Sequence, residues 1–440
     1  MPILAEQIPW GSAATGCSNK ASPLGPIGLL VTPSSPADKT SHQKRLVIGL
    51  EMFSAKEWIG GAVYLRNLVY TLAALPPTEQ PKLRLLYEEL AEPDLVADLR
   101  NFTFVDSHVA DRGVRTNFRL AHRVWGAARR RASWLFPAAG LGELHIVYPG
   151  FGPTVPGSVH VHWIPDFQHL VLPEFFSTEE CKRRTSTFAE IAAKRTMLVL
   201  SSQAALDDFQ RFFPDAVVTP RVWSFCSVIS DRERGGRNPF TTYQLPGKFA
   251  YVANQFWRHK DHTTVLVALA RLRHRGLEIP LVCTGLERDV RSPGYFDELM
   301  SLAAELGVCD QVRTLGMVPR ADQIEIFRHA ALVVQPSLFE GWSTVVEDAK
   351  AVAAPILLSD LPVHREQIAG MQRAWTFQPR DPDALANRLE EIWPTLPRRP
   401  NPAEEGAVAE AHEQRVVDAG RRFVVAAREA VDLFGRLDQE

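Results

Sequence analysis

The sequence predicts an α/β protein built from two consecutive doubly wound units. Short apolar runs of strand length alternate with amphipathic helical segments, which implies parallel sheets covered on both faces. This alternation stops at the polar stretch 230–247, which contains Gly and Pro, and then starts again. A chain of 440 residues, 45% apolar and 23% charged, has the size and composition of a globular protein with two or three domains.

The first predicted unit follows a segment without periodicity. Residues 1–43 are rich in Pro, Ser, Ala and Gly, so we interpret them as a flexible leader. The N-terminal unit is expected over residues 44–229. Its predicted strands are KRLVIGL, LRLLY, HIVYPG, SVHVHWIPD and TMLVLSS. Its predicted helices are GGAVYLRNLVYTLAAL, TEECKRRTSTFAEIAAKR and SQAALDDFQRFF, and Ser202 is the expected N-cap of the last one.

The second predicted unit repeats the pattern. Residues 230–247 are the predicted linker, and residues 248–403 are the C-terminal unit. Strands are expected at KFAYVAN, IPLVCTG, VRTLG, ALVVQ, PILLSD and AWTFQP, with helices between them. A last helix is expected over about residues 404–436. Because ligands of doubly wound sheets bind at the carboxyl ends of the strands, we expect the chemistry in the loops there.

Composition excludes several classes of function. The formal net charge of −2 favours neither nucleic acid nor an acidic membrane as the main partner. The five cysteines are scattered and lack a Cys-x-x-Cys pair, so they indicate neither a disulfide framework nor a zinc site and favour a reducing cytosol. No apolar run reaches the roughly 18 residues of a membrane-spanning helix, and no signal peptide is recognisable. We therefore expect a cytoplasmic protein.

An arginine-rich stretch qualifies that expectation. Arg115, Arg119 and Arg123 recur at helical intervals, which is typical of a solvated helix face. The alternative is a weak peripheral contact with acidic lipid at the inner face of the membrane, or with a phosphate-bearing acceptor.

The strongest chemical signal is PSLFEGWSTVVEDAKAVAAPILLSDLPVHREQ, residues 336–367. It follows a buried apolar run, so it begins at the carboxyl end of a strand. Gly341 lets the backbone approach a ligand closely. The helix expected to start near Ser343 and Thr344 offers free N–H groups and a positive dipole end to an anion. Glu340 can accept hydrogen bonds from sugar hydroxyls, so the stretch favours a site for a sugar attached to a diphosphate over a solvated strand–helix connection.

The same stretch resembles the nucleotide-sugar signature of retaining GT-B glycosyltransferases, the large group related to bacterial mannosyl- and glucosyltransferases. The family motif has two glutamates separated by seven residues, within Pro-Ser-x-x-Glu-Gly-Phe-Gly. Glu340 matches the first glutamate, and Asp348 stands at the second by register, with Glu347 one place early. Adjacent helical side chains diverge by roughly 100°, so both acids cannot face one ribose. We assign the ribose to Asp348 and keep Glu347 as the rival.

Two further loops extend the resemblance. In YVANQFWRHKDH, Lys260 matches a lysine that the family places on the leaving diphosphate. Gln255 stands five residues earlier, at the position of a family arginine, and Arg258 lies nearby but out of register. In HVHWIPDFQHLVLPEFFS, Asp166 matches the aspartate of a His-Asp pair that faces the sugar, whereas Pro165 replaces the histidine. The resemblance covers about residues 45–395.

Two short motifs, a glycine pair and an Asp-x-Asp sequence, also suggest ligand binding. Gly60 and Gly61 open the first predicted helix, where the family lets backbone N–H groups approach the donor phosphates and the acceptor. Asp381 and Asp383 look like the Asp-x-Asp metal motif of other sugar transferases. They stand directly before a predicted helix, so we interpret Asp381 or Asp383 as its N-cap. We expect neither a metal nor a cofactor.

The resemblance implies a GT-B architecture, with two Rossmann-like domains facing across a cleft and the last helix packing back on the first domain. It implies transfer of a sugar, with retention, from a nucleotide-sugar donor to a hydroxyl of a glycan, lipid-linked or small-molecule acceptor, in bacterial glycan or polysaccharide biosynthesis. Asp166, Lys260 and Glu340 are the implied catalytic residues. The implied donor-binding residues are Gly60, Gly61, Gln255, Arg258, Gly341, Trp342, Ser343, Thr344, Val345 and Asp348. Two alternatives stay open: a nucleotide-sugar epimerase on the same fold, and a non-catalytic sugar-nucleotide or glycan-binding subunit.

Overall fold

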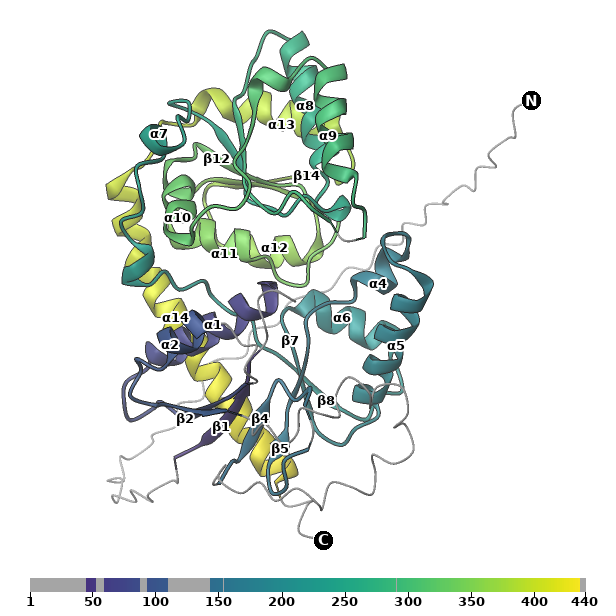
Figure 1. Ribbon diagram of the computed structural model, residues 1–440, viewed down its shortest axis with the longest axis vertical. Helices are drawn as coiled ribbons and strands as arrows, with labels where there is room; N and C mark the ends of the chain where they lie inside the picture. Colours follow the sequence, from purple (N-terminus) through teal and green to yellow (C-terminus); the bar gives the residue numbers. More distant parts are fainter. Residues whose placement is uncertain are drawn as a thin grey trace, which may run out of the picture. The chain divides into compact units, whose positions relative to one another are not determined.

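The structure, a computed structural model, describes six stretches of the chain. They are residues 45–52, 59–87, 93–109, 143–152, 154–289 and 291–435. The predicted leader at 1–43 and the arginines 115, 119 and 123 lie outside these stretches. From Arg45 onward the chain forms one compact unit. Within it two sets of parallel strands follow each other along the sequence, each covered by helices (Figure 1).

The N-terminal domain is built on parallel strands in the orders β3-β2-β1-β4-β5 and β6-β7-β8. Only Val161 separates β5 (Val159–His160) from β6 (His162–Ile164), and its N–H donates to the carbonyl oxygen of Val147 at 3.0 Å. The two sets are therefore continuous through residues 159–164. The remaining strands are β1 (Val47–Glu51), β2 (Lys82–Tyr87), β3 (Val105–Val109), β4 (Ile146–Tyr148), β7 (Met197–Leu200) and β8 (Thr219–Val222).

Helices cover these strands as the apolar periodicity predicts. In α1, the side chains of Leu65, Leu68, Val69 and Leu72 are fully buried in the domain core. Ser202 caps α6 by accepting a hydrogen bond from the N–H of Ala205 at 3.0 Å, as predicted. The elements α2, α4, β3 and β8 were not predicted from the sequence. The helices are α1 (Ile59–Ala73), α2 (Pro93–Leu99), α4 (Gln168–Val171), α5 (Thr178–Ala192) and α6 (Gln203–Phe212).

The C-terminal domain has one parallel sheet in the order β11-β10-β9-β12-β13-β14. The chain order reverses between β9 and β12, which is the switch point where ligands of such sheets bind. The strands are β9 (Ala250–Val252), β10 (Leu281–Cys283), β11 (Val312–Thr314), β12 (Leu332–Gln335), β13 (Ile356–Ser359) and β14 (Ala374–Phe377). The prediction of a second doubly wound unit is therefore confirmed.

Helices cover both faces of this sheet (Figure 1). A separate apolar core lies on each face. One core takes Leu269, Leu299 and Leu385 from the helices of one face. The other takes Phe327 and Val346 from the helices of the opposite face. The first group is α8 (His262–His274), α9 (Tyr295–Glu305) and α13 (Pro382–Ile392). The second group includes α10 (Arg320–His329) and α11 (Thr344–Ala351), which α12 (Pro362–Ile368) follows along the chain.

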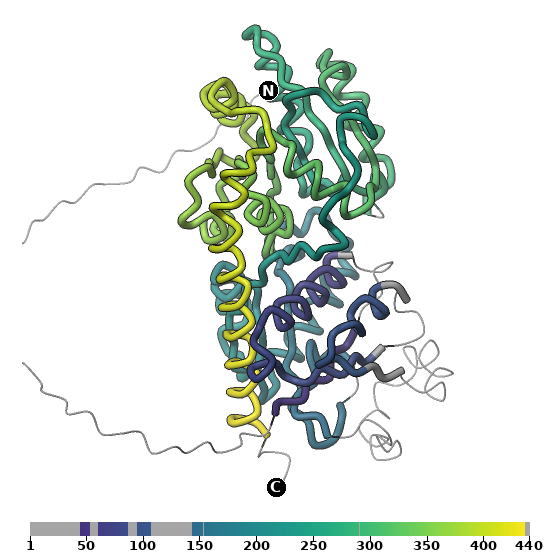
Figure 2. The backbone as a smooth tube through the Cα atoms, turned by 90° about the vertical axis from the view of Figure 1, so that its left-hand side faces the viewer, coloured from purple at the N-terminus to yellow at the C-terminus, as the bar shows by residue number. Residues whose placement is uncertain are grey.

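The last helix connects the two domains. α14 (Pro402–Phe434) starts beside the C-terminal domain and runs back along the N-terminal one (Figure 2). Phe423, Ala427 and Ala430 are part of the N-terminal core. At Gly420 the helix passes so close to α1 that an added Cβ would lie 2.9 Å from the carbonyl oxygen of Thr71. Within the described part of the chain, no helix combines the length and apolar character that crossing a membrane requires.

Candidate functional site

The candidate site lies at the carboxyl ends of β9 and β12, which are neighbours in the sheet. The loop after β9 ends in the single 3₁₀ turn η5 (Arg258–Lys260), and the loop after β12 leads into α11. The N–H of Leu338 donates to the carbonyl oxygen of His259 at 2.8 Å, which joins the two loops directly. Strand order therefore places side chains from residues about 80 positions apart in one site.

Lys260 and Glu340 form the centre of this site. The Lys260 Nζ lies 2.5 Å from Oε1 of Glu340, and their side chains are only 14% and 11% exposed. The amide Nε2 of Gln335 donates to the same oxygen at 2.8 Å, and Nδ2 of Asn254 donates to Oε1 of Gln335 at 2.8 Å. The carboxylate is thus held by a cation and by a buried amide chain.

The charge on Glu340 follows from these neighbours. Burial on its own raises the pKa of this carboxyl. The charges of Lys260 and His364, together with hydrogen bonds from Lys260 and Ser337, outweigh burial and hold the pKa of Glu340 below its usual value of 4.5. The group is therefore an ionised hydrogen-bond acceptor at neutral pH.

The start of α11 supplies donors next to that pair. Ser343 is the N-cap, and its own N–H donates to Oε1 of Gln367 at 3.0 Å. No described residue accepts a hydrogen bond from the N–H of Thr344 or Val345. Unpaired N–H groups at a helix start, together with the positive end of the helix dipole, form a ready site for an anion.

Gly341 connects this site with the N-terminal domain. An added Cβ at Gly341 would lie 2.1 Å from the carbonyl oxygen of Pro165 and 3.1 Å from Cβ of Asp166, so only glycine fits. The carbonyl oxygen of Gly341 accepts a hydrogen bond from Oγ of Ser202 at 2.9 Å. The loop that carries Asp166 therefore touches the loop that carries Glu340.

Asp166 itself has a local structural role as well. Its Oδ1 accepts a hydrogen bond from the N–H of Gln168 at 3.0 Å and lies 3.6 Å from Nη2 of Arg184. The side chain is 24% exposed, and no described residue donates a hydrogen bond to its second oxygen. Nearby His169 is buried among phenylalanines, and neither ring nitrogen has a described hydrogen-bond partner. Burial and then the charge of Arg184 lower the pKa of His169 to about 4.

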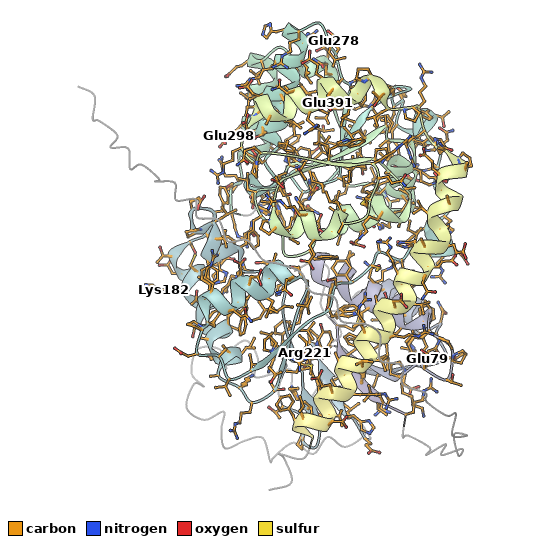
Figure 3. The ribbon with its side chains drawn as sticks, turned by 180° about the vertical axis from the view of Figure 1, so that it is seen from behind. Glu79, Lys182, Arg221, Glu278, Glu298 and Glu391 are labelled. Carbon is orange, nitrogen blue, oxygen red and sulfur yellow. The ribbon has the colours of Figure 1, made fainter. Side chains whose placement is uncertain are left out.

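Three other residues that were predicted to bind the donor have hydrogen-bond partners away from the Lys260–Glu340 pair. Arg258 turns to α9, where it pairs with both oxygens of Glu298 at 2.7 and 2.9 Å; Glu298 lies at the outer side of the C-terminal domain in Figure 3. Gln255 accepts a hydrogen bond from the N–H of Leu286 at 3.0 Å. The indole of Trp342 donates to the carbonyl oxygen of Phe225 at 2.9 Å and packs on the N-terminal core. The structure therefore does not bring the guanidinium of Arg258 to the Lys260–Glu340 pair.

The glycine pair and the two adjacent acids have clear positions. Gly60 is exposed and Gly61 is buried, both in the first turn of α1.

Asp348 is 4% exposed, and its carboxylate is bound by Arg320 and by Ser227 Oγ at 2.5 Å. Glu347 is fully buried and accepts from Nζ of Lys350 at 2.9 Å. The two acids diverge, as helical geometry requires.

An exposed apolar pair beside the site was not predicted. Leu286 is 43% exposed after β10, and Met317 is 58% exposed after β11. The two loops are joined by a hydrogen bond from the N–H of Gly285 to the carbonyl oxygen of Gly316 at 2.9 Å. Gly285 has φ +146°, and an added Cβ would lie 2.1 Å from the carbonyl oxygen of Asn254. A glycine shortly after each of these two strands, Gly285 and Gly316, was the signal in the sequence that could have indicated the paired loops.

The Asp-x-Asp sequence has the capping role expected of it. Asp381 accepts hydrogen bonds from the N–H groups of Asp383 and Ala384 at 3.0 and 2.9 Å, at the start of α13. Asp383 pairs with Arg271. Across the described stretches, no three His, Cys, Asp or Glu side chains are grouped as metal ligands.

Comparison with known proteins adds to this geometry. Residues 242–405 match the family model described as "Glycosyl transferases group 1". Proteins named D-inositol 3-phosphate glycosyltransferase are similar in sequence. The one from Corynebacterium urealyticum is 25% identical over 218 residues, 46% of this chain and 50% of the relative. The one from Salinispora tropica is 27% identical over 243 residues, 50% of this chain and 48% of the relative. The chain thus spans about half the length of these relatives.

Solved structures resemble nearly the whole chain. Sucrose-phosphate synthase from Thermosynechococcus elongatus aligns with a TM-score of 0.57 and 15% identity, over 90% of this chain and 98% of that one. HepE of Anabaena, solved with UDP and glucose, aligns with a TM-score of 0.55 and 14% identity, over 88% of this chain and 98% of that one. At such identities the likeness concerns the fold alone.

Proposed function

We propose that this chain, a GT-B protein of two Rossmann-like domains that carries a glycosyl transferases group 1 domain at residues 242–405, is a glycosyltransferase with a nucleotide-sugar donor. The observation that carries the proposal is the convergence of Lys260, Glu340 and the start of α11 at one sheet edge. A cation, free N–H groups and an ionised acceptor together match a sugar diphosphate. A fold alone would not support a function.

Catalysis in this proposal rests on charge stabilisation. The bond between sugar and phosphate stretches, and negative charge grows on the leaving diphosphate. Lys260 and the N–H groups of Thr344 and Val345 accept that charge. At an effective dielectric near 20, a cation about 4 Å from a phosphate oxygen contributes on the order of 4 kcal/mol. Glu340 orients the sugar through its hydroxyls, and no step needs a metal ion.

The nucleoside has a matching surface in the proposal. Leu286 and Met317 present apolar area on which a flat base can pack. Asp348 is the acid assigned to the ribose. UDP is the first nucleotide to test, because the fold is shared with HepE, which was solved with UDP.

The acceptor is proposed to bind beside Asp166, in contact with the N-terminal domain. Asp166 would accept a hydrogen bond from the attacking hydroxyl, and the leaving phosphate would assist its deprotonation, with retention at the sugar. The acceptor is a glycan, a lipid-linked sugar or a small molecule. D-inositol 3-phosphate is the first candidate, because similar proteins carry its name and because Arg184 lies beside Asp166.

The setting is also proposed. The cysteines at 181, 226, 283 and 309 are free thiols in the described residues, which favours a reducing compartment. We place the reaction in the cytoplasm, in bacterial glycan or polysaccharide biosynthesis, with at most a weak peripheral membrane contact.

A ligand panel followed by product analysis tests the proposal. Thermal shift with UDP, GDP, ADP and their sugars should show stabilisation by one nucleotide series, because a ligand that binds only the native state raises its stability. The matching donor should then lose its sugar to an added acceptor, with the anomeric configuration read by NMR. An epimerase would convert the donor without an acceptor. A binding subunit would be stabilised but would turn over no donor, and either result would contradict the transferase.

A further inference from the structure

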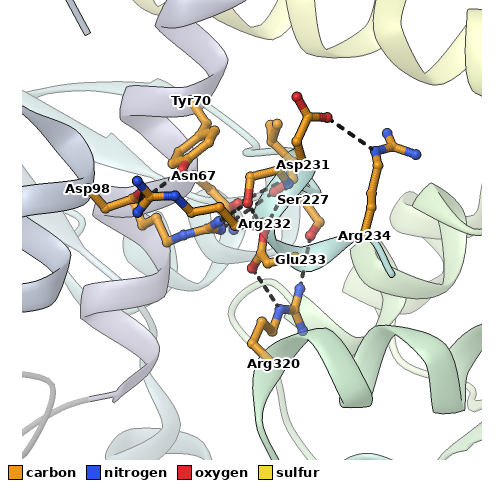
Figure 4. A network of polar contacts seen from close by, with 12 residues as sticks. Asn67, Tyr70, Asp98, Ser227, Asp231, Arg232, Glu233, Arg234 and Arg320 are labelled. Atoms are coloured by element: carbon orange, nitrogen blue, oxygen red, sulfur yellow. Dashed lines mark hydrogen bonds and ion pairs between the residues drawn. The ribbon is translucent and has the colours of Figure 1, made fainter. Parts of the chain in front are cut away.

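A chain of ionic contacts leads from Asp348 to the N-terminal domain. Figure 4 shows its middle part, where Arg320 approaches Glu233. Arg320, the first residue of α10, donates to both oxygens of Asp348 at 2.5 and 2.7 Å. Its Nε lies 3.4 Å from Oε1 of Glu233, in the short turn η4 (Asp231–Glu233). Oε2 of Glu233 lies 2.5 Å from Nη2 of Arg66 on α1. Four charged groups thus connect α11, α10, residues 227–233 (called the interdomain segment below) and α1.

The interdomain segment is fixed at several points along this chain. Ser230 donates to Glu233 through its N–H and its hydroxyl, both at 2.8 Å. The N–H of Val228 donates to Oδ1 of Asn67 on α1 at 3.1 Å. Ser227 donates its hydroxyl to Asp348, and its carbonyl oxygen lies 2.8 Å from Nε2 of His412 on α14. Glu233 therefore belongs to a segment that forms hydrogen bonds with residues of both domains.

Burial makes this network sensitive to the loss of one member. The side chains of Asp348, Glu233 and Arg66 are 6%, 10% and 16% exposed, whereas that of Arg320 is 32% exposed. The positive charges of the two arginines balance the negative charges of the two carboxylates. Removing one partner of a buried ion pair leaves an uncompensated charge, which is more costly than removing both. Asp348 accepts hydrogen bonds from Nη1 and Nη2 of Arg320, and Glu233 is the ion-pair partner beside Nε of the same guanidinium, so the two carboxylates hold it from different sides.

Arg320 in turn limits what Asp348 can bind. Oδ1 of Asp348 accepts from Arg320 and Ser227, and Oδ2 accepts from Arg320. Each carboxylate oxygen offers about two acceptor directions, so one direction on Oδ2 is not used by any described residue. If Arg320 moved, the rotamer of Asp348 and this remaining direction would move with it.

We propose that Glu233 is a positioning residue for nucleotide binding: it orients Arg320, which fixes the carboxylate of Asp348 for the ribose. The inference rests on the proposed function and assigns a role to a residue outside the donor motif. Because Glu233 also binds Arg66, the affinity for the nucleotide depends on how the interdomain segment sits on α1.

Calorimetric titration with UDP, GDP and ADP at low temperature tests the role. For whichever nucleotide binds the wild type, Glu233→Gln should raise Kd about tenfold. In assays of donor turnover, Glu233→Gln should raise KM and leave kcat nearly unchanged. Arg320→Gln should raise Kd at least as much, and the double variant should match Arg320→Gln alone. Arg66→Lys keeps a positively charged partner for Glu233, so this variant should retain most of the affinity.

The control uses the same turn. Arg232 pairs with Asp98 at 2.9 Å and is 71% exposed. Arg232→Gln removes an ion pair between η4 and α2 without touching Glu233, and its Kd should equal that of the wild type. If Glu233→Gln does not fold, Glu233→Asp keeps the charge, shortens the reach to Arg320 and should still raise Kd.

The outcomes separate the two proposals. A wild type that binds none of the three nucleotides overturns the proposed function and this inference with it. A wild type that binds one of them, with the same Kd in the Glu233 variants, overturns only the role of Glu233. Independent, multiplying effects of Glu233→Gln and Arg320→Gln overturn it too, because Glu233 would then not act through Arg320.

Discussion

Lys260 Nζ and Glu340 Oε1 lie 2.5 Å apart, in an ion pair that joins the loops after β9 and β12. The pair brings the group proposed for the leaving diphosphate into contact with the group proposed for the sugar. Both side chains are largely buried, so replacing either one leaves the charge of the other buried and unpaired. Binding and stability are therefore coupled at this position.

The pair leads to the first prediction. From the sequence, Lys260→Ala and Glu340→Ala are expected to lower donor turnover while leaving the thermal midpoint nearly unchanged. The buried pair changes the second half of that expectation. Lys260→Met or Glu340→Gln alone should reduce the free energy of unfolding by about 3 kcal/mol, because one partner remains buried and unpaired. Turnover should fall at least about tenfold in both.

The double variant separates the two effects. Lys260→Met with Glu340→Gln removes both charges, so urea unfolding should show recovery of much of the lost stability while turnover stays low. A double variant that regains turnover as well would mean that the pair has only a structural role.

The second prediction concerns the contact between the domains at Gly341. In Gly341→Ala the added Cβ would meet the backbone oxygen of Pro165 at 2.1 Å, so the two loops must separate. Donor turnover should fall at least about tenfold, because a shift of about 1 Å in a catalytic group has effects of this size. Gly406→Ala is the control. Nothing lies within 4 Å of an added Cβ at this helical position, so stability should rise by roughly 0.5–1 kcal/mol without loss of turnover. Equal turnover in both variants would contradict the role of this contact.

The sequence predicted much of the geometry of the candidate site because the central part of this geometry is local in the chain. An apolar strand, a loop with a glycine and a helix start follow each other over residues 332–351, so spacing alone placed Glu340, Gly341 and the free N–H groups. The carboxyl-end rule for parallel sheets then brought Lys260 to the same edge.

What spacing could not show is the direction of single side chains. Arg258 is two residues from Lys260, yet in the 3₁₀ turn η5 such residues are about 240° apart, and Arg258 pairs with α9. The partners of Asp348 are Arg320 and Ser227, 28 and 121 positions away. No local pattern encodes such contacts, because they arise only when α10, α11 and the interdomain segment pack together.

The third prediction concerns Glu366 of α12. Its carboxylate accepts hydrogen bonds from the N–H groups of Gln203 and Ala204 at 2.9 and 3.4 Å, at the start of α6 in the other domain. Glu366→Gln removes an anion from a helix N-terminus, an interaction of roughly 0.3–1 kcal/mol. The KM for the donor should rise about two- to fivefold, because this contact joins the two domains between which we propose that the substrates bind.

The neighbouring Arg365 provides the control. It is exposed and pairs with Asp360 at 2.6 Å within the C-terminal domain. Arg365→Gln should leave KM at the wild-type value. If both variants raise KM equally, the effect belongs to α12 as a whole and the cap is irrelevant.

The fourth prediction separates capping from metal binding at Asp381. Asp381→Ala removes the N-cap of α13, so unfolding should require about 1 kcal/mol less free energy. Turnover should stay within twofold of the wild type, and treatment with EDTA should leave it unchanged, as expected of a reaction that needs no metal. Loss of turnover that manganese restores would show instead that the Asp-x-Asp sequence is a metal site.

The last prediction is a pH dependence that originates at His262. This residue is 3% exposed, lies against Phe256 at 4.5 Å between ring centroids, and has no described hydrogen-bond partner at either ring nitrogen. Burial, followed by the charge of Lys260, lowers the pKa of His262 to about 3 from its usual 6.5. Between these values the unfolded chain binds a proton that the folded chain does not. The free energy of unfolding therefore falls as pH decreases from 6.5, by about 1.4 kcal/mol per pH unit for one histidine.

Removal of the imidazole should remove this share of the slope. Urea unfolding of His262→Leu should be measured at several pH values between 5 and 8. In a plot of the free energy of unfolding against pH, the slope for His262→Leu should equal that of the wild type above pH 7 and be shallower below pH 6. The control is His274→Leu, whose side chain is exposed at the other end of α8, and it shows the effect of losing a histidine as such. Parallel curves for the wild type and His262→Leu would mean that the folded protein takes up a proton at His262 as readily as the unfolded chain, which contradicts its burial as a neutral group.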